Sequence, residues 1–91
     1  MPGLEWRNKM INEIIEKLRE FTNDHHIKLW MNAGSEGPIY DFIFEKECYD
    51  GYVDWFKFFI DINGVEDVNE TVNGIAEYYL RKIYGPDAVT M

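Results

Sequence analysis

The chain has little cysteine, few basic residues and no long hydrophobic run. Cys48 is its single cysteine, so no disulfide can form within the chain, and a reducing compartment is the simpler interpretation. Its longest runs of aliphatic and phenylalanine residues, such as 58–60, have three residues and are far too short to cross a bilayer. The N-terminal residues contain no apolar stretch of signal-peptide length. These absences favour a soluble, cytoplasmic protein with no membrane partner.

Positive charge is scarce and unevenly distributed. The formal net charge is −8, with a pI near 4.6. Residues 1–35 are neutral in sum, whereas residues 36–77 hold eleven acidic side chains and two basic ones. A chain of this charge repels phosphate backbones and anionic headgroups, so we expect no direct binding to nucleic acid. The acidity indicates either a solubilising surface or a surface for a basic partner.

Apolar and aromatic residues are plentiful. The hydrophobic fraction is 46% and the aromatic fraction 16%, which is typical of a globular protein. Ninety-one residues predict a single domain over 1–91. A chain of this length buries roughly 60–65% of its unfolded surface, enough to fold alone with a thin margin.

Two segments have helical periodicity. Apolar residues recur at helical spacing from Leu4 to Phe21, which predicts a helix over about 4–22. A second helix is predicted over about 67–84, where Asp67 and Glu70 form the Asp variant of a capping box. Gly85 and the proline after it end this helix, and residues 85–91 are predicted to be a loose tail.

Between the helices, three segments alternate apolar and polar residues. They predict strands over about 26–32, 38–46 and 52–62, separated by turn signals at 34–37 and 47–51. Two hairpins in series make a meander. The predicted fold is therefore α+β, in the order helix, three-stranded antiparallel meander, helix (αβββα), with both amphipathic helices on one sheet face.

Turn lengths set a predicted register for the strands. Placing Ala33 opposite Pro38, and Lys46 opposite Tyr52, gives one sheet face that is almost wholly apolar. The helices should cover that face, whose residues are Ile27, Leu29, Met31, Tyr40, Phe42, Phe44, Phe56, Phe58, Ile60 and Ile62. The opposite face is mixed, with predicted cross-strand rows Lys28–Ile43–Trp55, Trp30–Asp41–Lys57 and Asn32–Ile39–Phe59.

The mixed face is the candidate partner-binding surface. Aromatic anchors within a polar surround are typical of interface centres. The candidate residues are Trp30, Ile39, Asp41, Ile43, Trp55, Lys57 and Phe59, with Asp41 and Lys57 as a cross-strand ion pair. Alternatively, Leu4 and Trp6, or Ala88 and Val89, fold across this face and cover it. The third strand is also a sheet edge, and its aromatic residues invite pairing with another chain.

Residues for catalysis or metal binding are sparse. Cys48 could lie near His25 and His26, as in a cysteine nucleophile or a metal site, but no second cysteine and no recurring ligand spacing supports this. The segment 61–64 begins like a calcium loop, but Val72 stands where the bidentate glutamate belongs. We therefore expect no catalytic residue, no metal and no cofactor.

The element order resembles that of the double-stranded RNA-binding domain. That family binds RNA with a basic cluster at the start of its last helix. The matching segment here, 65–70, is acidic, so the resemblance implies topology and no RNA-binding activity.

These observations favour a small, acidic, non-enzymatic protein-interaction module. It would bind a protein partner, or a second copy of itself, through the open sheet face or the edge strand. The alternative is an acidic inhibitor that imitates nucleic acid and occupies a basic nucleic-acid-binding protein, by analogy with small acidic proteins of mobile elements. A third hypothesis is an enzyme that uses Cys48 with His25 or His26.

Overall fold

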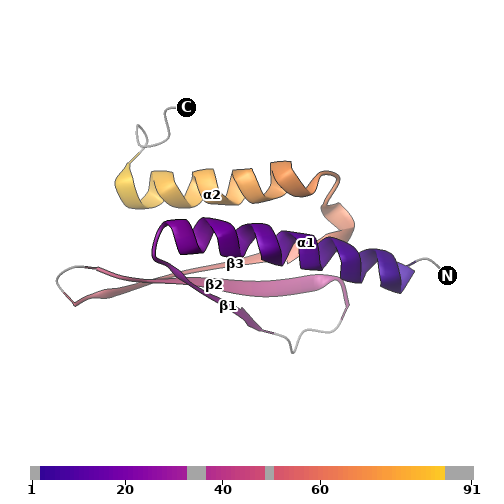
Figure 1. Ribbon diagram of the computed structural model, residues 1–91, viewed down its shortest axis with the longest axis horizontal. Coiled ribbons are helices and arrows are strands. Elements are labelled where there is room, and N and C mark those ends of the chain that lie inside the picture. The colour runs from indigo at the N-terminus through magenta and orange to yellow at the C-terminus, as the bar shows by residue number, and fades with distance from the viewer. Residues whose placement is uncertain (1–2, 33–36, 49–50, 86–91) are drawn as a thin grey trace.

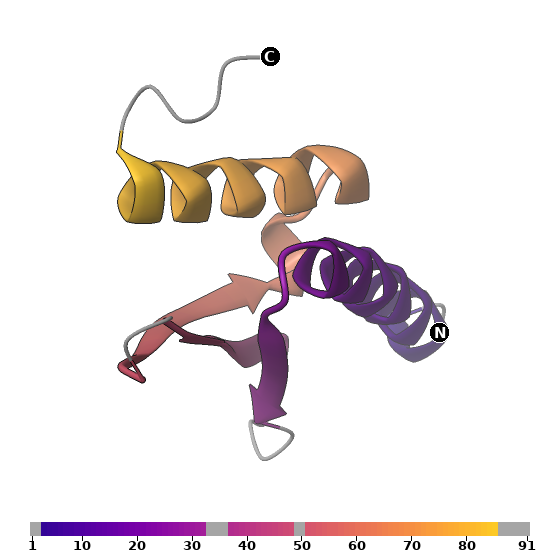
Figure 2. The same cartoon turned by 60° about the vertical axis from the view of Figure 1, so that its left-hand side comes forward.

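The chain forms two helices and a three-stranded antiparallel sheet. The computed structural model describes residues 3–32, 37–48 and 51–85, with side chains from residue 8 onward in the first helix. The order is α1 (Gly3–Asp24), β1 (Lys28–Asn32), β2 (Ile39–Glu47), β3 (Val53–Asp61), a 3-10 turn (Ile62–Gly64) and α2 (Val68–Tyr84). Both helices lie on one side of the sheet (Figure 1; Figure 2), which confirms the predicted α+β fold.

The first helix packs through its apolar stripe and ends in a backbone-bonded cap. Ile11, Ile14 and Leu18 are buried, at the three- and four-residue spacing that places them on one face. At its end, Ile27 N–H donates to the Thr22 carbonyl and His26 N–H to the Asn23 carbonyl, the bonds of a Schellman motif. His26 takes the left-handed conformation, with φ of 56°. Residues 25–27 form this cap, so β1 begins at Lys28 rather than at 26.

The sheet order is β1-β2-β3, and both predicted registers are wrong by two residues. Leu29 lies opposite Phe44, and Phe44 opposite Phe56. At the second hairpin Cys48, not Lys46, lies opposite Tyr52, with its N–H 2.6 Å from the Tyr52 carbonyl oxygen. Gly51, whose φ of 86° favours glycine, makes this tighter turn possible. Ala33, the anchor of the first predicted register, lies outside the described residues.

Because both register errors are even, each side chain keeps its predicted face. Phe42, Phe44, Ile60 and Ile62 are buried beneath the helices. Most of the other predicted inward residues are half-buried, and Met31, near the sheet margin, is exposed. The strand phasing that decides which side of the sheet carries the core is thus confirmed.

The second helix closes the core with an aromatic contact. Asp67 is its N-cap and accepts from the Glu70 N–H at 3.1 Å, as the capping-box pattern predicts. Tyr79 of this helix is buried, with its ring centroid 5.0 Å from that of Phe44 and 5.3 Å from that of Phe56. Phe21 of α1 reaches the same cluster, 5.8 Å from Phe44. The core therefore lies between the sheet and both helices, which leaves the other sheet face free of it.

Candidate functional site

The sheet face turned away from the helices, here the open face, carries all seven candidate residues. It presents three exposed aromatic side chains, Trp30 at 54%, Trp55 at 61% and Phe59 at 68% of their maximal exposure. Ile39 and the charged residues Asp41 and Lys57 are also exposed, and Ile43 is half-buried. No described segment covers this face.

Cross-strand neighbours on the open face differ from the prediction because of the two-residue shifts. The observed rows are Lys28–Glu45–Trp55, Trp30–Ile43–Lys57 and Asn32–Asp41–Phe59. The predicted Asp41–Lys57 pairing is therefore wrong, and no ion pair joins them in the part of the chain described here. Instead, Lys28 Nζ lies 3.7 Å from Glu45 Oε2 at the margin of the face.

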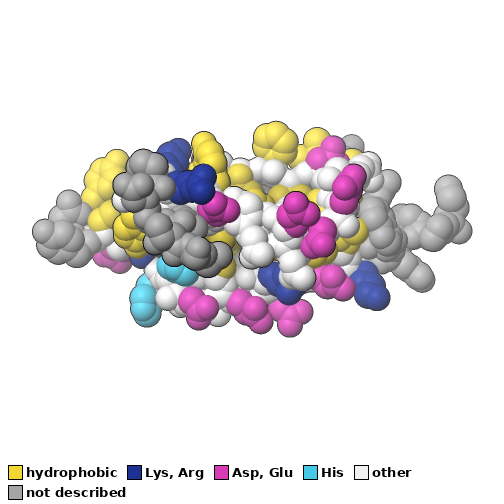
Figure 3. All heavy atoms as spheres, turned by 90° about the horizontal axis from the view of Figure 1, so that it is seen from above, with side chains coloured by type: hydrophobic (Ala, Val, Ile, Leu, Met, Phe, Trp, Pro, Cys, Tyr) yellow, Lys and Arg dark blue, Asp and Glu magenta, His cyan; other side chains and the backbone are white. Residues whose placement is uncertain are grey.

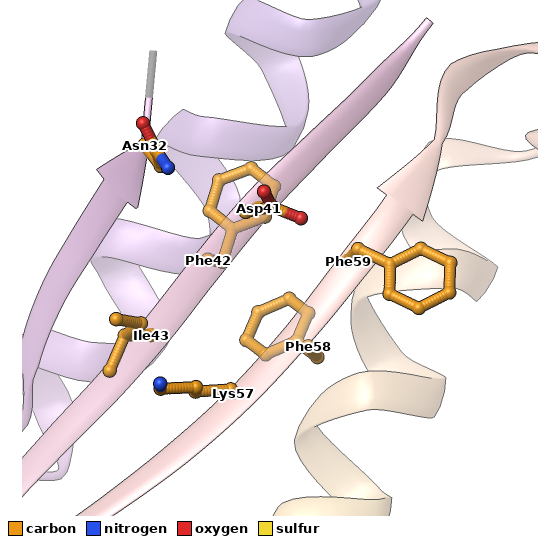
Figure 4. Close-up of a pocket in the computed structure, with 7 residues that line it drawn as sticks. All are labelled: Asn32, Asp41, Phe42, Ile43, Lys57, Phe58 and Phe59. Atoms are coloured by element: carbon orange, nitrogen blue, oxygen red, sulfur yellow. The ribbon is translucent and has the colours of Figure 1, made fainter. Parts of the chain in front are cut away.

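A shallow hollow lies between β2 and β3 on this face. Its volume is about 270 Å³, and its lining includes Asp41, Ile43, Lys57 and Phe59. In Figure 4 the Lys57 side chain lies toward Ile43 on β2, while the Phe59 ring extends away from β2, past the outer side of β3. The hollow thus has an apolar floor with one cation and one carboxylate beside it.

The open face carries an exposed apolar residue that the sequence prediction did not name. Val53, the first residue of β3, is exposed and shares a side-chain direction with Trp55, because alternate residues of a strand point to one face. The alternation of residues 53–59 carried this signal. The seven candidate residues predicted from the sequence did not include Val53.

At the suggested His–Cys corner, His25 contacts groups of α1 and β2. The His25 Nδ1 lies 2.9 Å from the Phe21 carbonyl oxygen, and the His25 carbonyl accepts from Lys46 Nζ at 2.8 Å. The second bond ties the end of α1 to β2. Among the described residues, no hydrogen bond joins Cys48 to either histidine, and no cluster of three or more His, Cys, Asp or Glu side chains could hold a metal.

The alternative cover for the open face falls outside the described part. The side chains of Leu4 and Trp6 are not described, and neither are Ala88 and Val89. The two helices that cover the sheet, α1 and α2, lie on its other face (Figure 2).

Comparison with family models, curated proteins and solved structures finds no match for this chain. The likeness to the double-stranded RNA-binding domain therefore stays one of element order. Within the described residues, neither helix combines the length and the apolar character needed to cross a membrane.

Proposed function

We propose that this chain is a non-enzymatic protein-interaction module that binds through the open face of its sheet. The observation that carries the proposal is the exposure of Trp30, Trp55 and Phe59 on a face with no described cover. Aromatic residues are enriched in binding hot spots because they bury a large apolar area with few rotatable bonds. Scattered single aromatics need no such explanation, but these three share one face.

The polar residues of the open face suit the margin of such an interface. Lys28 and Glu45 pair at one end of it, and Asp41 and Lys57 flank the hollow. The opposite side of the molecule is different in character. Figure 3 shows Asp and Glu side chains spread over the helix side, with Lys and Arg among them. The helix side also shows hydrophobic side chains in this view, and Tyr78 and Tyr84 of α2 are exposed, so the open face is distinguished by three aromatic side chains gathered on one sheet face.

Capture by an immobilised chain tests the proposal. Resin carrying the unmodified chain is compared with resin carrying Trp55→Ala, and with Tyr84→Ala as a matched control. Tyr84 is exposed to 59%, close to the 61% of Trp55, but it lies at the end of α2. We expect the unmodified chain and Tyr84→Ala to retain the same protein, either a cellular partner or a soluble tagged copy of the chain. Trp55→Ala should retain at least tenfold less of it, because a central interface tryptophan is worth about 2 kcal/mol or more.

Equal retention by all three resins, at unchanged circular dichroism, would remove the open face as the binding surface.

The cytoplasm is the proposed location, since a chain with one half-buried cysteine needs no oxidising compartment.

The net charge of −8 favours a second candidate, an acidic inhibitor that occupies the nucleic-acid site of a basic protein. The purified chain would then compete with DNA for basic cellular proteins, and competition would weaken steeply as salt rises. Binding that is indifferent to salt would exclude this function.

A further inference from the structure

In β3, an edge strand of the sheet, the residues with exposed side chains on the open face are also the residues whose backbone groups point to the free edge. β3 is an edge strand of nine residues, against five for the other edge strand, β1. No described segment pairs with its outer side. An edge strand of this length presents a row of N–H and C=O groups that can pair with another strand.

Two hydrogen bonds fix which residues of β3 turn these groups outward. Cys48 N–H donates to the Tyr52 carbonyl, and Ile62 N–H donates to the Pro38 carbonyl at 2.9 Å. In an antiparallel ladder the bonded pairs alternate, so the even-numbered residues between Tyr52 and Ile62 bond to β2. The odd-numbered residues 53–61 therefore direct their N–H and C=O groups to the free edge, and these same residues face the open side.

We propose that β3 pairs antiparallel with β3 of a second copy, so that the two sheets join into one of six strands. The inference rests on the proposed function and names its partner. The twofold axis passes beside Phe56, which places Trp55 opposite Lys57 of the second copy and Val53 opposite Phe59. Each of these contacts then occurs twice, as a twofold interface requires. On pairing, the Lys57 side chain turns from β2 toward the second copy, so that its ammonium meets the face of an indole, and the Val53 side chain meets a phenyl ring.

Neighbouring registers give less favourable cross-strand contacts. A shift that centres the axis on Lys57 sets two lysines directly opposite each other, and like charges across a strand pair are destabilising. The opposite shift centres the axis on Trp55 and sets Lys57 against Val53, so the lysine loses its contact with an indole, and Phe59 lies opposite Gly51, which has no side chain to contact. A one-residue slip would bring open-face side chains against helix-side ones. A lysine in the middle of an edge strand commonly disfavours pairing with another strand. In the proposed dimer, Lys57 instead favours one register over its neighbours.

On the helix side of β3, Phe56 lies beside the proposed axis. Phe56 is half-buried there, with the Tyr78 ring 5.8 Å away and Lys82 Nζ 5.1 Å from its ring centroid. In the proposed register the two Phe56 residues form the close, non-hydrogen-bonded pair at the axis. On the open side, the Phe59 ring already extends past the outer side of β3 (Figure 4). The charge of −8 on each copy opposes association, so pairing should strengthen as salt rises from low to physiological concentration.

Directed disulfide formation tests the register. Two full-length variants are made in a Cys48→Ser background, Trp55→Cys and Lys57→Cys, and both replaced side chains are exposed. Mixed and mildly oxidised, the two chains should form a covalent heterodimer, because opposed Cα atoms of a bonded pair lie about 5.5 Å apart. That heterodimer also keeps one Trp55–Lys57 contact. Either variant alone should stay largely uncrosslinked, since identical positions would lie about 8 Å apart, beyond the disulfide limit of about 7 Å.

Mass spectrometry separates the products because the two chains differ in mass. A heterodimer in at least fivefold excess over either homodimer supports the pairing. Preferential homodimers of Lys57→Cys, or of Trp55→Cys, would overturn it in favour of a register centred on that residue. Absence of any crosslink, together with a monomeric mass of the unmodified chain, would overturn it as well. In that last case, Trp55-dependent capture of another protein would still leave the proposed function standing.

Discussion

Removal of one hydroxyl group from the core should make the protein more stable. Tyr79 is 2% exposed, and its phenolic oxygen has no hydrogen-bond partner among the described residues. A buried hydroxyl without a partner costs about 1–3 kcal/mol of desolvation. Its ring, in contrast, contacts Phe44 and Phe56 edge-on, and a phenylalanine would keep both contacts. Tyr79→Phe should therefore raise the free energy of unfolding by about 1 kcal/mol.

Thermal and urea unfolding, followed by circular dichroism, measure the effect. A gain of 1 kcal/mol corresponds to roughly 4–8 °C in Tm for a domain of this size. Tyr78→Phe is the matched control, because Tyr78 is 63% exposed and its hydroxyl is not among the buried, unpartnered groups, so we expect a change within about 0.5 kcal/mol. Tyr79→Ala removes the ring as well and should cost about 3–5 kcal/mol.

The pH dependence gives a second readout of the same hydroxyl. Burial, and then the nearby Asp54 carboxylate, raise the pKa of Tyr79 from 10.0 to about 12. The stability that comes from keeping the phenol neutral is fully present below the unfolded-state pKa, and is lost as pH rises toward the folded-state pKa. The unmodified chain should lose stability more steeply between these values than Tyr79→Phe. A destabilisation of 1 kcal/mol or more by Tyr79→Phe at pH 7 would refute the reasoning, because the hydroxyl would then have a partner.

Two further substitutions test the helix ends and interiors. His26→Gly should stabilise the fold by about 0.5–1 kcal/mol, because the φ of 56° is strained for histidine and easy for glycine; unchanged or lower stability in urea unfolding would contradict the cap geometry. Gly74→Ala should stabilise by about 0.5–1 kcal/mol, since Gly74 lies within α2, is exposed, and a Cβ there meets no atom within 4 Å; a loss of helicity or of stability would show that this surface of α2 is occupied.

The side of the sheet that each residue faces could be predicted from the sequence, whereas its cross-strand neighbour could not. Phe42 and Phe44 are inward in every even register, so the apolar alternation decides the face and nothing more. The neighbour depends on turn geometry, and the positive φ of Gly51 was not visible in a segment that also admits a longer loop. This is why the predicted Asp41–Lys57 pair failed while the exposure of Trp30 and Trp55 matched.

Helix boundaries divide in the same way. The Asp67 cap follows a common local pattern and could be predicted. The cap at His26 could not, because a histidine seldom adopts the left-handed conformation, and the bonds that hold it there come from backbone groups. The candidate surface itself required only the alternation of β1, β2 and β3. The proposal of a second copy as its partner depends on the edge position of β3 and on the direction of the free backbone groups of that strand, which only the structure shows.

Sedimentation equilibrium of the unmodified chain and of Trp55→Ala, over a concentration series at physiological salt, tests most directly whether the open face and the β3 edge bind a second copy. The account predicts that the unmodified chain shifts from 10.8 kDa toward twice that mass as concentration rises, and that Trp55→Ala remains at the lower mass. A single 10.8 kDa species for both chains, or dimers that form equally well without Trp55, would contradict it.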